Sequence, residues 1–270
     1  MSTQSIKSRI RSFLPHPLLE ALFQIRDGLY AEKIPDSDRY VSCVTGKYGI
    51  EIGGPSSLFK HTLPLYKKID GLDSVNFSGT TIWEGNIKEG RTFSYYKNKV
   101  GFQYISDGTD LSKISDSVYD FVLSSNCLEH IANPLNALKE WGRTLKDDGF
   151  LILILPNKKN NFDHNRPTTS FKHILEDYNN KTSEHDLTHL EEILSLHDLS
   201  MDPPAGDIDN FKRRSLDNFN NRTLHHHVFD LDLMTLMIDF IGFKCLTKYE
   251  GSKNLFLLAV KEAKSIQPHH

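Results

Sequence analysis

The segment that decides the fold is Lys47-Tyr48-Gly49-Ile50-Glu51-Ile52-Gly53-Gly54-Pro55-Ser56-Ser57. Its first half has the pattern of a short strand, and its glycines open the strand into a turn that precedes an expected helix. In such a strand–turn–helix unit, backbone N–H groups at the start of the helix can face a ligand. The segment therefore predicts the first strand of a sheet with a ligand site at its carboxyl end.

Strand-like and helix-like segments alternate after this point. A helix that Asn133 caps and Pro134 begins is expected to end at 147–149. The expected strands are 69–73, 101–105, 119–123 and 150–155. Strands that alternate with helices form a parallel sheet, so the sequence predicts a doubly wound α/β fold.

The C-terminal part of the chain carries two more strand patterns, at 242–249 and 254–260. Only residues 250–253 separate them. Parallel strands need a long crossover, so this connector predicts an antiparallel hairpin. The expected architecture is a mostly parallel sheet that ends in an antiparallel edge strand.

Composition excludes several classes of protein. The chain has 270 residues, 38% of them hydrophobic and 25% charged, which is typical of a soluble globular protein. No 18 apolar residues run together, so no membrane-spanning helix is expected. A net charge of −3 gives no basic field for nucleic acid. The three widely spaced cysteines form neither a disulfide framework nor a zinc motif, which favours the reducing cytoplasm.

Residues 157–227 differ from the rest of the chain. This segment is polar and holds eight of the 13 histidines, and it is too long for a loop in a compact domain. We interpret it as a mostly helical insertion after the fifth strand. The predicted organisation is an N-terminal helical extension (1–45, with a helix from Pro17 to about Leu29), an α/β domain (46–156 and 228–262) and this insertion.

Six motifs follow one another in the α/β part with a characteristic spacing: Glu51-Ile52-Gly53-Gly54, Asp107-Gly108-Thr109-Asp110-Leu111, Tyr119-Asp120-Phe121-Val122, Leu128-Glu129-His130-Ile131, Leu135-Asn136-Ala137-Leu138 and Leu145-Lys146-Asp147-Asp148-Gly149-Phe150. In this order they resemble the class I S-adenosylmethionine-dependent methyltransferases, in particular the small-molecule and sugar methyltransferases. The resemblance covers about residues 47–157 and extends to the terminal hairpin. It implies a Rossmann-like sheet of seven strands, the last of them antiparallel.

The resemblance also implies cofactor ligands. Gly53 and Gly54 would line the methionine part of S-adenosylmethionine, and Glu51 would brace their loop. Asp73 follows Gly53 by 20 residues, a spacing at which a carboxylate can hold a ribose. The remaining implied ligands are Asp107 and Gly108 at the adenine, and Asn126 and Cys127 over the methionyl end.

The glycine loop departs from the family at Pro55. Proline and serine stand where the family has its second and third glycines, and proline offers no N–H. Pro55 must therefore meet the cofactor differently from a glycine. If the altered loop holds no cofactor, the alternative is a binding or assembly module on a methyltransferase fold.

Methyl transfer to a hydroxyl can need a base. His130, after the fourth strand, and His164, just past the fifth, are the candidates. Residues of the insertion that can recognise an anionic or hydroxylated acceptor are Asp163, Arg166, Arg222 and His226. The insertion resembles one in bacterial methyltransferases of glycan biosynthesis, so we expect O-methylation of a small hydroxylated acceptor such as a sugar or nucleotide sugar.

The insertion also has a metal-binding pattern. If residues 185–192 are helical, His185 and His189 share one face and Glu192 lies one turn further on. Imidazoles and a carboxylate at this spacing can bind a divalent metal. Without a metal, the same residues can form a polar hydrogen-bond network. With a metal, an alternative to methyl transfer is that the protein is a metal-dependent hydrolase or lyase.

Overall fold

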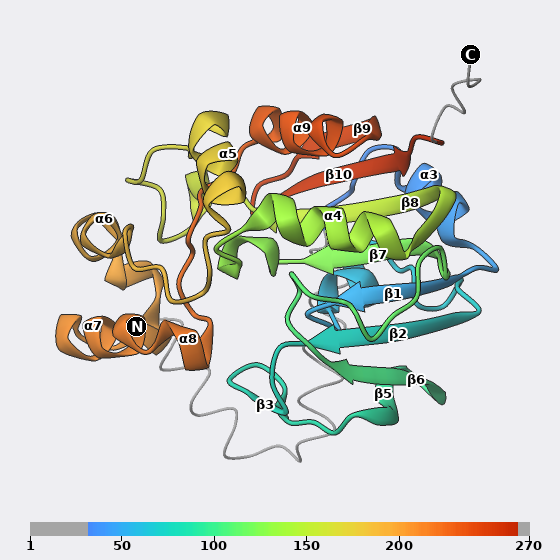
Figure 1. The fold of residues 1–270 in the computed structure, drawn as a ribbon, viewed down its shortest axis with the longest axis horizontal. Helices are drawn as coiled ribbons and strands as arrows, with labels where there is room; N and C mark the ends of the chain where they lie inside the picture. The colour runs from blue at the N-terminus through green and yellow to red at the C-terminus, as the bar shows by residue number, and fades with distance from the viewer. Residues whose placement is uncertain (1–31, 264–270) are drawn as a thin grey trace.

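A computed structural model of the chain describes residues 32–263 and has an eight-stranded sheet at its centre (Figure 1). The strands lie in the order β5-β6-β2-β1-β7-β8-β10-β9. Their bounds are β1 (Tyr48–Ile52), β2 (Gly71–Asn76), β5 (Gly90–Tyr96), β6 (Lys99–Ile105), β7 (Tyr119–Ser125), β8 (Leu145–Pro156), β9 (Phe243–Glu250) and β10 (Asn254–Lys261).

The direction of the strands confirms the predicted mostly parallel sheet. The pairs β6–β2, β2–β1, β1–β7 and β7–β8 are parallel, whereas β10 runs antiparallel to both β8 and β9. The sheet has eight strands rather than the expected seven, because β5 pairs antiparallel with β6 through a tight connection between Tyr96 and Lys99. This extra strand forms the edge of the sheet opposite β9.

The terminal hairpin forms as predicted, but its antiparallel strand is not at the edge. Strand β10 lies between β8 and β9, and β9 is the edge strand. The residues explain this order: Leu255 to Ala259 of β10 are all buried, whereas β9 carries exposed Lys244 and Lys248. An apolar strand takes the covered position, and lysines suit an edge.

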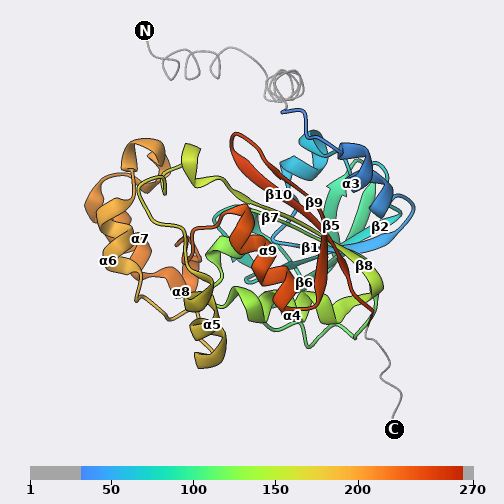
Figure 2. The ribbon, with the colours of Figure 1, turned by 90° about the horizontal axis from the view of Figure 1, so that it is seen from above.

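Helices cover both faces of the sheet (Figure 2). On one face lie α4 (Pro134–Thr144) and α9 (Leu231–Phe240), and on the other lies α3 (Ser37–Val44). Strand β8 serves both cores, because Leu151, Leu153 and Leu155 pack in the first and Ile152 and Ile154 in the second. This alternation buries the central strands on both sides.

Two expected helices end sooner than the sequence suggested. After the glycine loop there is only a five-residue π-helix, Leu58–Thr62, because Pro64 forces Leu63 out of helical geometry. Helix α4 begins at Pro134 with the Asn133 side chain as its cap, as predicted. It ends at Thr144, since Leu145 is already extended, so 147–149 belong to β8.

The insertion lies beyond the carboxyl ends of the parallel strands (Figure 1). Its helices are α5 (Phe171–Asn180), α6 (Leu190–Leu196), α7 (Ile208–Leu216) and α8 (Asn218–Asn221), with 3₁₀ turns at Lys158–Asn160, Leu199–Met201 and Pro203–Ala205. A small hairpin, β3 (Thr80–Thr81) and β4 (Gly85–Asn86), follows β2 on the same side. Within 32–263, no helix is long and apolar enough to cross a membrane. The helix expected at 17–29 lies outside the described residues.

Candidate active site

A cavity of about 590 Å³ lies between the carboxyl edge of the sheet and the insertion. A ligand site at this edge is expected in open α/β sheets, where adjacent strands turn their connections to opposite faces. The volume is within the range of small-molecule sites. The sheet side is lined by residues that follow β1, β2, β6, β7 and β8, and the far side by residues of the insertion: Asn161, Phe162, Asp202, Pro204, Arg214, Arg222, Thr223 and His225.

The glycine loop forms one wall of the cavity. Gly53 has a φ of +80°, and a Cβ there would lie 2.8 Å from the Cys127 sulfur, so a side chain does not fit. Gly53 lines the cavity, but Gly54 and Pro55 do not. A Cβ on Gly54 would lie 2.2 Å from the Glu51 carboxyl carbon, so Gly54 is needed for packing against Glu51.

Glu51 braces this loop from behind. Its fully buried carboxylate accepts hydrogen bonds from the Tyr66 hydroxyl at 2.7 and 2.9 Å and from the Ser56 backbone N–H at 3.0 Å. Burial raises the Glu51 pKa to about 8, against the lowering effect of these hydrogen bonds. Glu51 does not line the cavity, so its contribution is to the shape of the loop.

Asp73 lies away from the cavity, which differs from the position expected from its spacing. Strand β2 continues to Asn76, so Asp73 lies three residues before the strand ends. Its carboxylate is buried and accepts hydrogen bonds from the hydroxyls of Tyr48 (2.7 Å) and Tyr119 (2.9 Å) and from the Phe102 N–H (2.8 Å). All three partners are residues of strands in the sheet, and Asp73 does not line the cavity.

A different carboxylate occupies the place expected of Asp73. Glu84, on the β3–β4 hairpin that follows β2, lines the cavity. It is half-buried, and burial raises its pKa. Its neighbours in the lining after β2 are Asn76 and Phe77. No hydrogen bond or ion pair engages the Glu84 carboxylate among the described residues, so it is open to a ligand hydroxyl.

Asp107 and Gly108 line the cavity after β6, at the position expected for adenine. The Asp107 carboxylate accepts from the Thr109 hydroxyl and N–H and forms an ion pair of 2.8 Å with Arg222. Burial raises the Asp107 pKa, but these partners outweigh it and hold the pKa below its usual value. Arg222 also pairs with Glu184 at 3.2 Å, so it links the sheet edge to the insertion.

Asn126 and Cys127 line the cavity after β7. Burial raises the pKa of the Cys127 thiol to about 12, so the thiol is neutral. A neutral, buried thiol packs as a small apolar group and is no nucleophile. Both residues are placed where they can cover the end of a bound cofactor.

Three titratable side chains meet where the sheet edge joins the insertion: Glu129, His130 and His225. The His225 Nδ1 lies 2.5 Å from a carboxylate oxygen of Asp163, which keeps a proton on Nδ1 and, against the effect of burial, raises the His225 pKa. In the neutral form of the ring, Nε2 is therefore the acceptor. One oxygen of Glu129 is buried without a hydrogen bond. Burial raises the Glu129 pKa to about 7, against the lowering effect of His225.

His130 belongs to the same group. Its Nδ1 lies 3.1 Å from the Leu224 carbonyl oxygen, to which it donates, so its Nε2 is also an acceptor. Burial and the neighbouring His225 hold the His130 pKa well below its ordinary value. Its ring packs against Trp83 with centroids 5.2 Å apart. His130 is therefore a neutral imidazole inside the cavity.

His164 and three predicted acceptor ligands lie outside the cavity, which corrects their assignments. His164 is partly exposed, 3.8 Å from Asp198. Arg166 is fully buried, and its guanidinium bonds to Asp163, Glu192 and the carbonyl oxygens of 225 and 226. His226 is buried against Asn218 and Glu184. Of the four predicted acceptor ligands (Asp163, Arg166, Arg222 and His226), only Arg222 lines the cavity.

The structure does not bring the predicted metal ligands together. Residues 185–189 are not helical, because the Asp186 carboxylate accepts from the Thr188 N–H and hydroxyl in a local turn. His185 stacks on Phe219 with ring centroids 3.9 Å apart, and Glu192 pairs with Arg166. The remaining predicted ligand, His189, instead lies beside a different set of side chains, described below.

Sequence reasoning missed Glu84, Glu129 and His225. Glu129 belongs to the motif Leu128-Glu129-His130-Ile131. Its place in that motif, between a buried strand and the next helix, could have marked it as a buried side chain. His225 was one of three consecutive histidines, and only tertiary contacts show which one faces the cavity. No local pattern marks Glu84.

The chain is similar to known methyltransferases. Residues 69–153 match a family model described as a methyltransferase domain. A crystal structure of an S-adenosylmethionine-dependent methyltransferase from Mesorhizobium loti is 10% identical with a TM-score of 0.50, covering 84% of this chain and 96% of that one. One from Methanosarcina mazei is 14% identical with a TM-score of 0.47, covering 86% and 99%. No curated protein matches the sequence.

Residues 69–153 thus match a methyltransferase domain, and they lie within a sheet of the predicted Rossmann-like methyltransferase fold. This confirms the predicted fold and agrees with the expected cofactor, S-adenosylmethionine. The residues of the cavity fit that cofactor: Gly53 leaves room that a Cβ would fill, and Glu84 offers an open carboxylate after β2.

Proposed function

We propose that this enzyme transfers a methyl group from S-adenosylmethionine to a hydroxyl of a small acceptor, such as a sugar or nucleotide sugar used in glycan assembly. The proposal rests on the difference between the two sides of the cavity. Its sheet side has the residues expected around a nucleoside cofactor, and its insertion side has an oriented histidine–carboxylate pair, His225 and Asp163.

On the sheet side, the proposed cofactor ligands differ from those that spacing suggested. Glu84 takes the role first given to Asp73, since a carboxylate beside the end of β2 can accept from both ribose hydroxyls. Asp107 and Gly108 flank the adenine, and Gly53 lets the backbone approach the methionine part. The bound cofactor supplies an electrophilic methyl group on a sulfonium.

On the insertion side, His225 is the proposed base. It would take the proton of the acceptor hydroxyl at Nε2, while Asp163 holds the ring and stabilises the imidazolium that forms. His130 is the second candidate, because its Nε2 is also a free acceptor and it lines the same part of the cavity. Both rings lie close together, with centroids 4.7 Å apart.

The acceptor pocket offers groups that suit a phosphorylated or polyhydroxylated molecule. Arg214 lines the cavity, and its Nε is buried without a hydrogen bond although its Nη2 pairs with Asp202 at 2.9 Å. A phosphate or ring hydroxyl can satisfy that donor. Phe162 adds an aromatic surface, and Asn161 an amide. This combination favours a nucleotide sugar over an apolar acceptor.

The test compares His225→Asn with wild-type protein on a panel of sugars and nucleotide sugars. Loss of a general base should lower kcat by about 10²- to 10⁴-fold. The dissociation constant of S-adenosylhomocysteine should stay unchanged, because His225 contacts the acceptor side. His130→Asn distinguishes the second candidate: if it abolishes turnover while His225→Asn leaves kcat intact, the base is His130. Methylation of none of the panel would contradict the acceptor class.

A further inference from the structure

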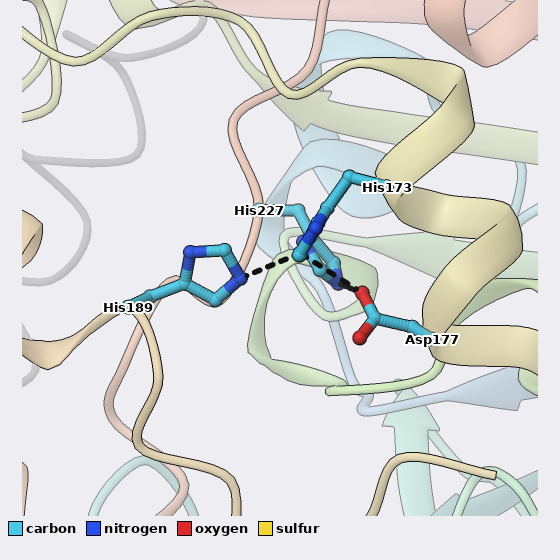
Figure 3. Close-up of side chains that lie close together, drawn as sticks. All are labelled: His173, Asp177, His189 and His227. Atoms are coloured by element: carbon cyan, nitrogen blue, oxygen red, sulfur yellow. Dashed lines mark hydrogen bonds and ion pairs between the residues drawn. The ribbon is translucent and has the colours of Figure 1, made fainter. Parts of the chain in front are cut away.

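A second group of histidines lies outside the cavity, in the insertion. His173 and Asp177 come from one face of α5, His189 from the turn before α6, and His227 from the segment that leads to α9 (Figure 3). One ligand atom from each of the four residues lies within 4.8 Å of the others. We propose that these four side chains bind a zinc ion.

Three of the six distances between these atoms are near those of a tetrahedral site, and all six are within 4.8 Å. His173 Nε2 lies 2.9 Å from His189 Nε2 and 3.2 Å from Asp177 Oδ2, and His227 Nε2 lies 3.5 Å from Asp177 Oδ2. Ligands about 2.0–2.1 Å from a tetrahedral zinc ion are about 3.3–3.4 Å apart. The spacing of the side chains thus leaves room for an ion at their centre.

Hydrogen bonding accounts for only some of these contacts: His173 Nε2 and His189 Nε2 share a hydrogen bond, but the Asp177 carboxylate is only half satisfied. Asp177 Oδ2 is buried and has no hydrogen-bond partner, although histidine nitrogens lie on two sides of it. A neutral imidazole carries one N–H and one lone pair, so three rings around a carboxylate bring several lone pairs together. A cation at the centre accepts all of them. His227 Nε2 lies 3.2 Å from the Ala132 carbonyl oxygen. In the zinc-bound protein the His227 ring would carry its proton on Nδ1, so that the Nε2 lone pair binds the metal in place of that contact.

Neighbouring residues hold the ligands in place, as outer partners of metal sites do. The Thr182 hydroxyl donates to the other oxygen of Asp177 at 3.0 Å, and the Asn133 amide donates to the Asp177 carbonyl oxygen at 3.0 Å. His173 and Asp177 are four residues apart on α5, so the helix presents both on one face. The site is therefore built on a helix rather than on loops alone.

The ligand chemistry selects the metal. Three imidazoles and one carboxylate suit zinc, whereas magnesium and calcium prefer oxygen ligands alone. Four protein ligands close a tetrahedral site and leave no position for a substrate, which is typical of a structural zinc site. The ion would fasten α5, the turn at His189 and the segment at His227 to one another.

This role is independent of methyl transfer, but it bears on the cavity. His227 lies two residues after His225. A zinc ion at this point would fix the backbone that carries His225, the proposed base.

The experiment measures zinc in the full-length protein, expressed without an affinity tag and dialysed against metal-free buffer, by inductively coupled plasma mass spectrometry. We expect one zinc ion per chain, and a fall in melting temperature after chelation that added zinc reverses. Loss of a direct ligand in His189→Asn or Asp177→Asn should lower zinc affinity about 100-fold or more, at least as much as loss of an outer partner.

His185→Asn is the matched control, because His185 lies in the same stretch, is exposed and stacks on Phe219 away from the four residues. It should retain one zinc ion per chain. Cobalt substitution adds a test that does not depend on any variant: a tetrahedral site gives intense visible absorption. Folded wild-type protein that takes up neither zinc nor cobalt at micromolar concentration would overturn the proposal, as would retention of zinc in both ligand variants.

Discussion

The two halves of this molecule are stabilised in different ways. The sheet packs against its helices through two large apolar clusters, to which β1, β2, β7, β8 and β10 all contribute buried side chains. The insertion has a core of only four buried apolar residues, Ile193, Ala205, Phe211 and Leu224. It instead buries many polar and charged side chains: Asp163, Arg166, Asp177, Glu184, Asp202, Ser215, Asn218, His226 and His227.

These two kinds of packing suit the different roles that we propose for the two halves. Apolar packing is non-directional and fixes a rigid sheet edge on which glycines, amides and carboxylates can be displayed. Buried ion pairs orient individual groups, as Asp163 orients His225, but they stabilise a fold only while every partner is present. The insertion should therefore be the half that single polar substitutions disrupt.

The largest effect is expected from Arg166→Met. Arg166 is the most buried cation of the insertion. Its loss leaves the buried Asp163 with His225 as its one remaining charged partner, and the carbonyl oxygens of 225 and 226 without the Arg166 donor. Removing one partner of a buried ion pair costs about 3–5 kcal/mol of unfolding free energy. Hydrogen exchange should show faster opening in 157–227 than in the sheet.

Lys172→Ala is the control for Arg166→Met. Lys172 forms only an exposed pair with Glu176 at 3.6 Å, and such pairs contribute at most about 1 kcal/mol. If Arg166→Met lowers the free energy of unfolding no more than Lys172→Ala does, the buried ion pairs of Arg166 do not stabilise the insertion.

A smaller effect is expected at the sheet edge from Glu84→Gln. A carboxylate that accepts two ribose hydroxyls becomes a neutral amide, and hydrogen bonds to a charged group contribute about 1.5–3 kcal/mol. The dissociation constant of S-adenosylhomocysteine should rise about 10- to 100-fold, measured by calorimetry. Glu89→Gln, an exposed carboxylate paired with Lys113 outside the cavity, should leave it unchanged. If Glu84→Gln and Glu89→Gln bind S-adenosylhomocysteine equally well, Glu84 does not bind the ribose.

The smallest effect is expected from Glu51→Gln. Burial raises the Glu51 pKa to about 8, so the side chain is mostly uncharged at neutral pH and an amide is a close substitute. Affinity for S-adenosylhomocysteine should change by less than about 1 kcal/mol, or about fivefold. Glu51→Ala, which removes the brace from the loop, should weaken binding much more. A large loss of affinity in Glu51→Gln would mean that cofactor binding needs the negative charge of Glu51.

The sequence predicted the sheet half well because its signals are local. The apolar runs at 119–123 and 150–155 predicted central strands, and the short connector at 250–253 predicted the hairpin. The error at Asp73 has a local cause as well: counting 20 residues from Gly53 assumed that the second strand ended there, but β2 runs on to Asn76.

The insertion was harder to predict because its determining contacts join residues distant in sequence. Asp163 meets His225 across 62 positions, and Arg222 meets Asp107 across 115. No helical periodicity records such pairs, and the expected helix through His185 and His189 gave way to a turn that Asp186 stabilises. Composition identified a histidine-rich segment correctly, but only the fold shows that its histidines separate: His225 lies at the cavity, whereas His173, His189 and His227 lie together outside it.

The central claim is that the sheet edge binds the cofactor and the insertion performs the proton transfer. Calorimetric titration of S-adenosylhomocysteine into wild-type and His225→Asn proteins tests it most directly. We predict micromolar dissociation constants that agree between the two, together with loss of turnover in the variant. Absence of binding to folded wild-type protein, or loss of binding in His225→Asn, would contradict this division of the site.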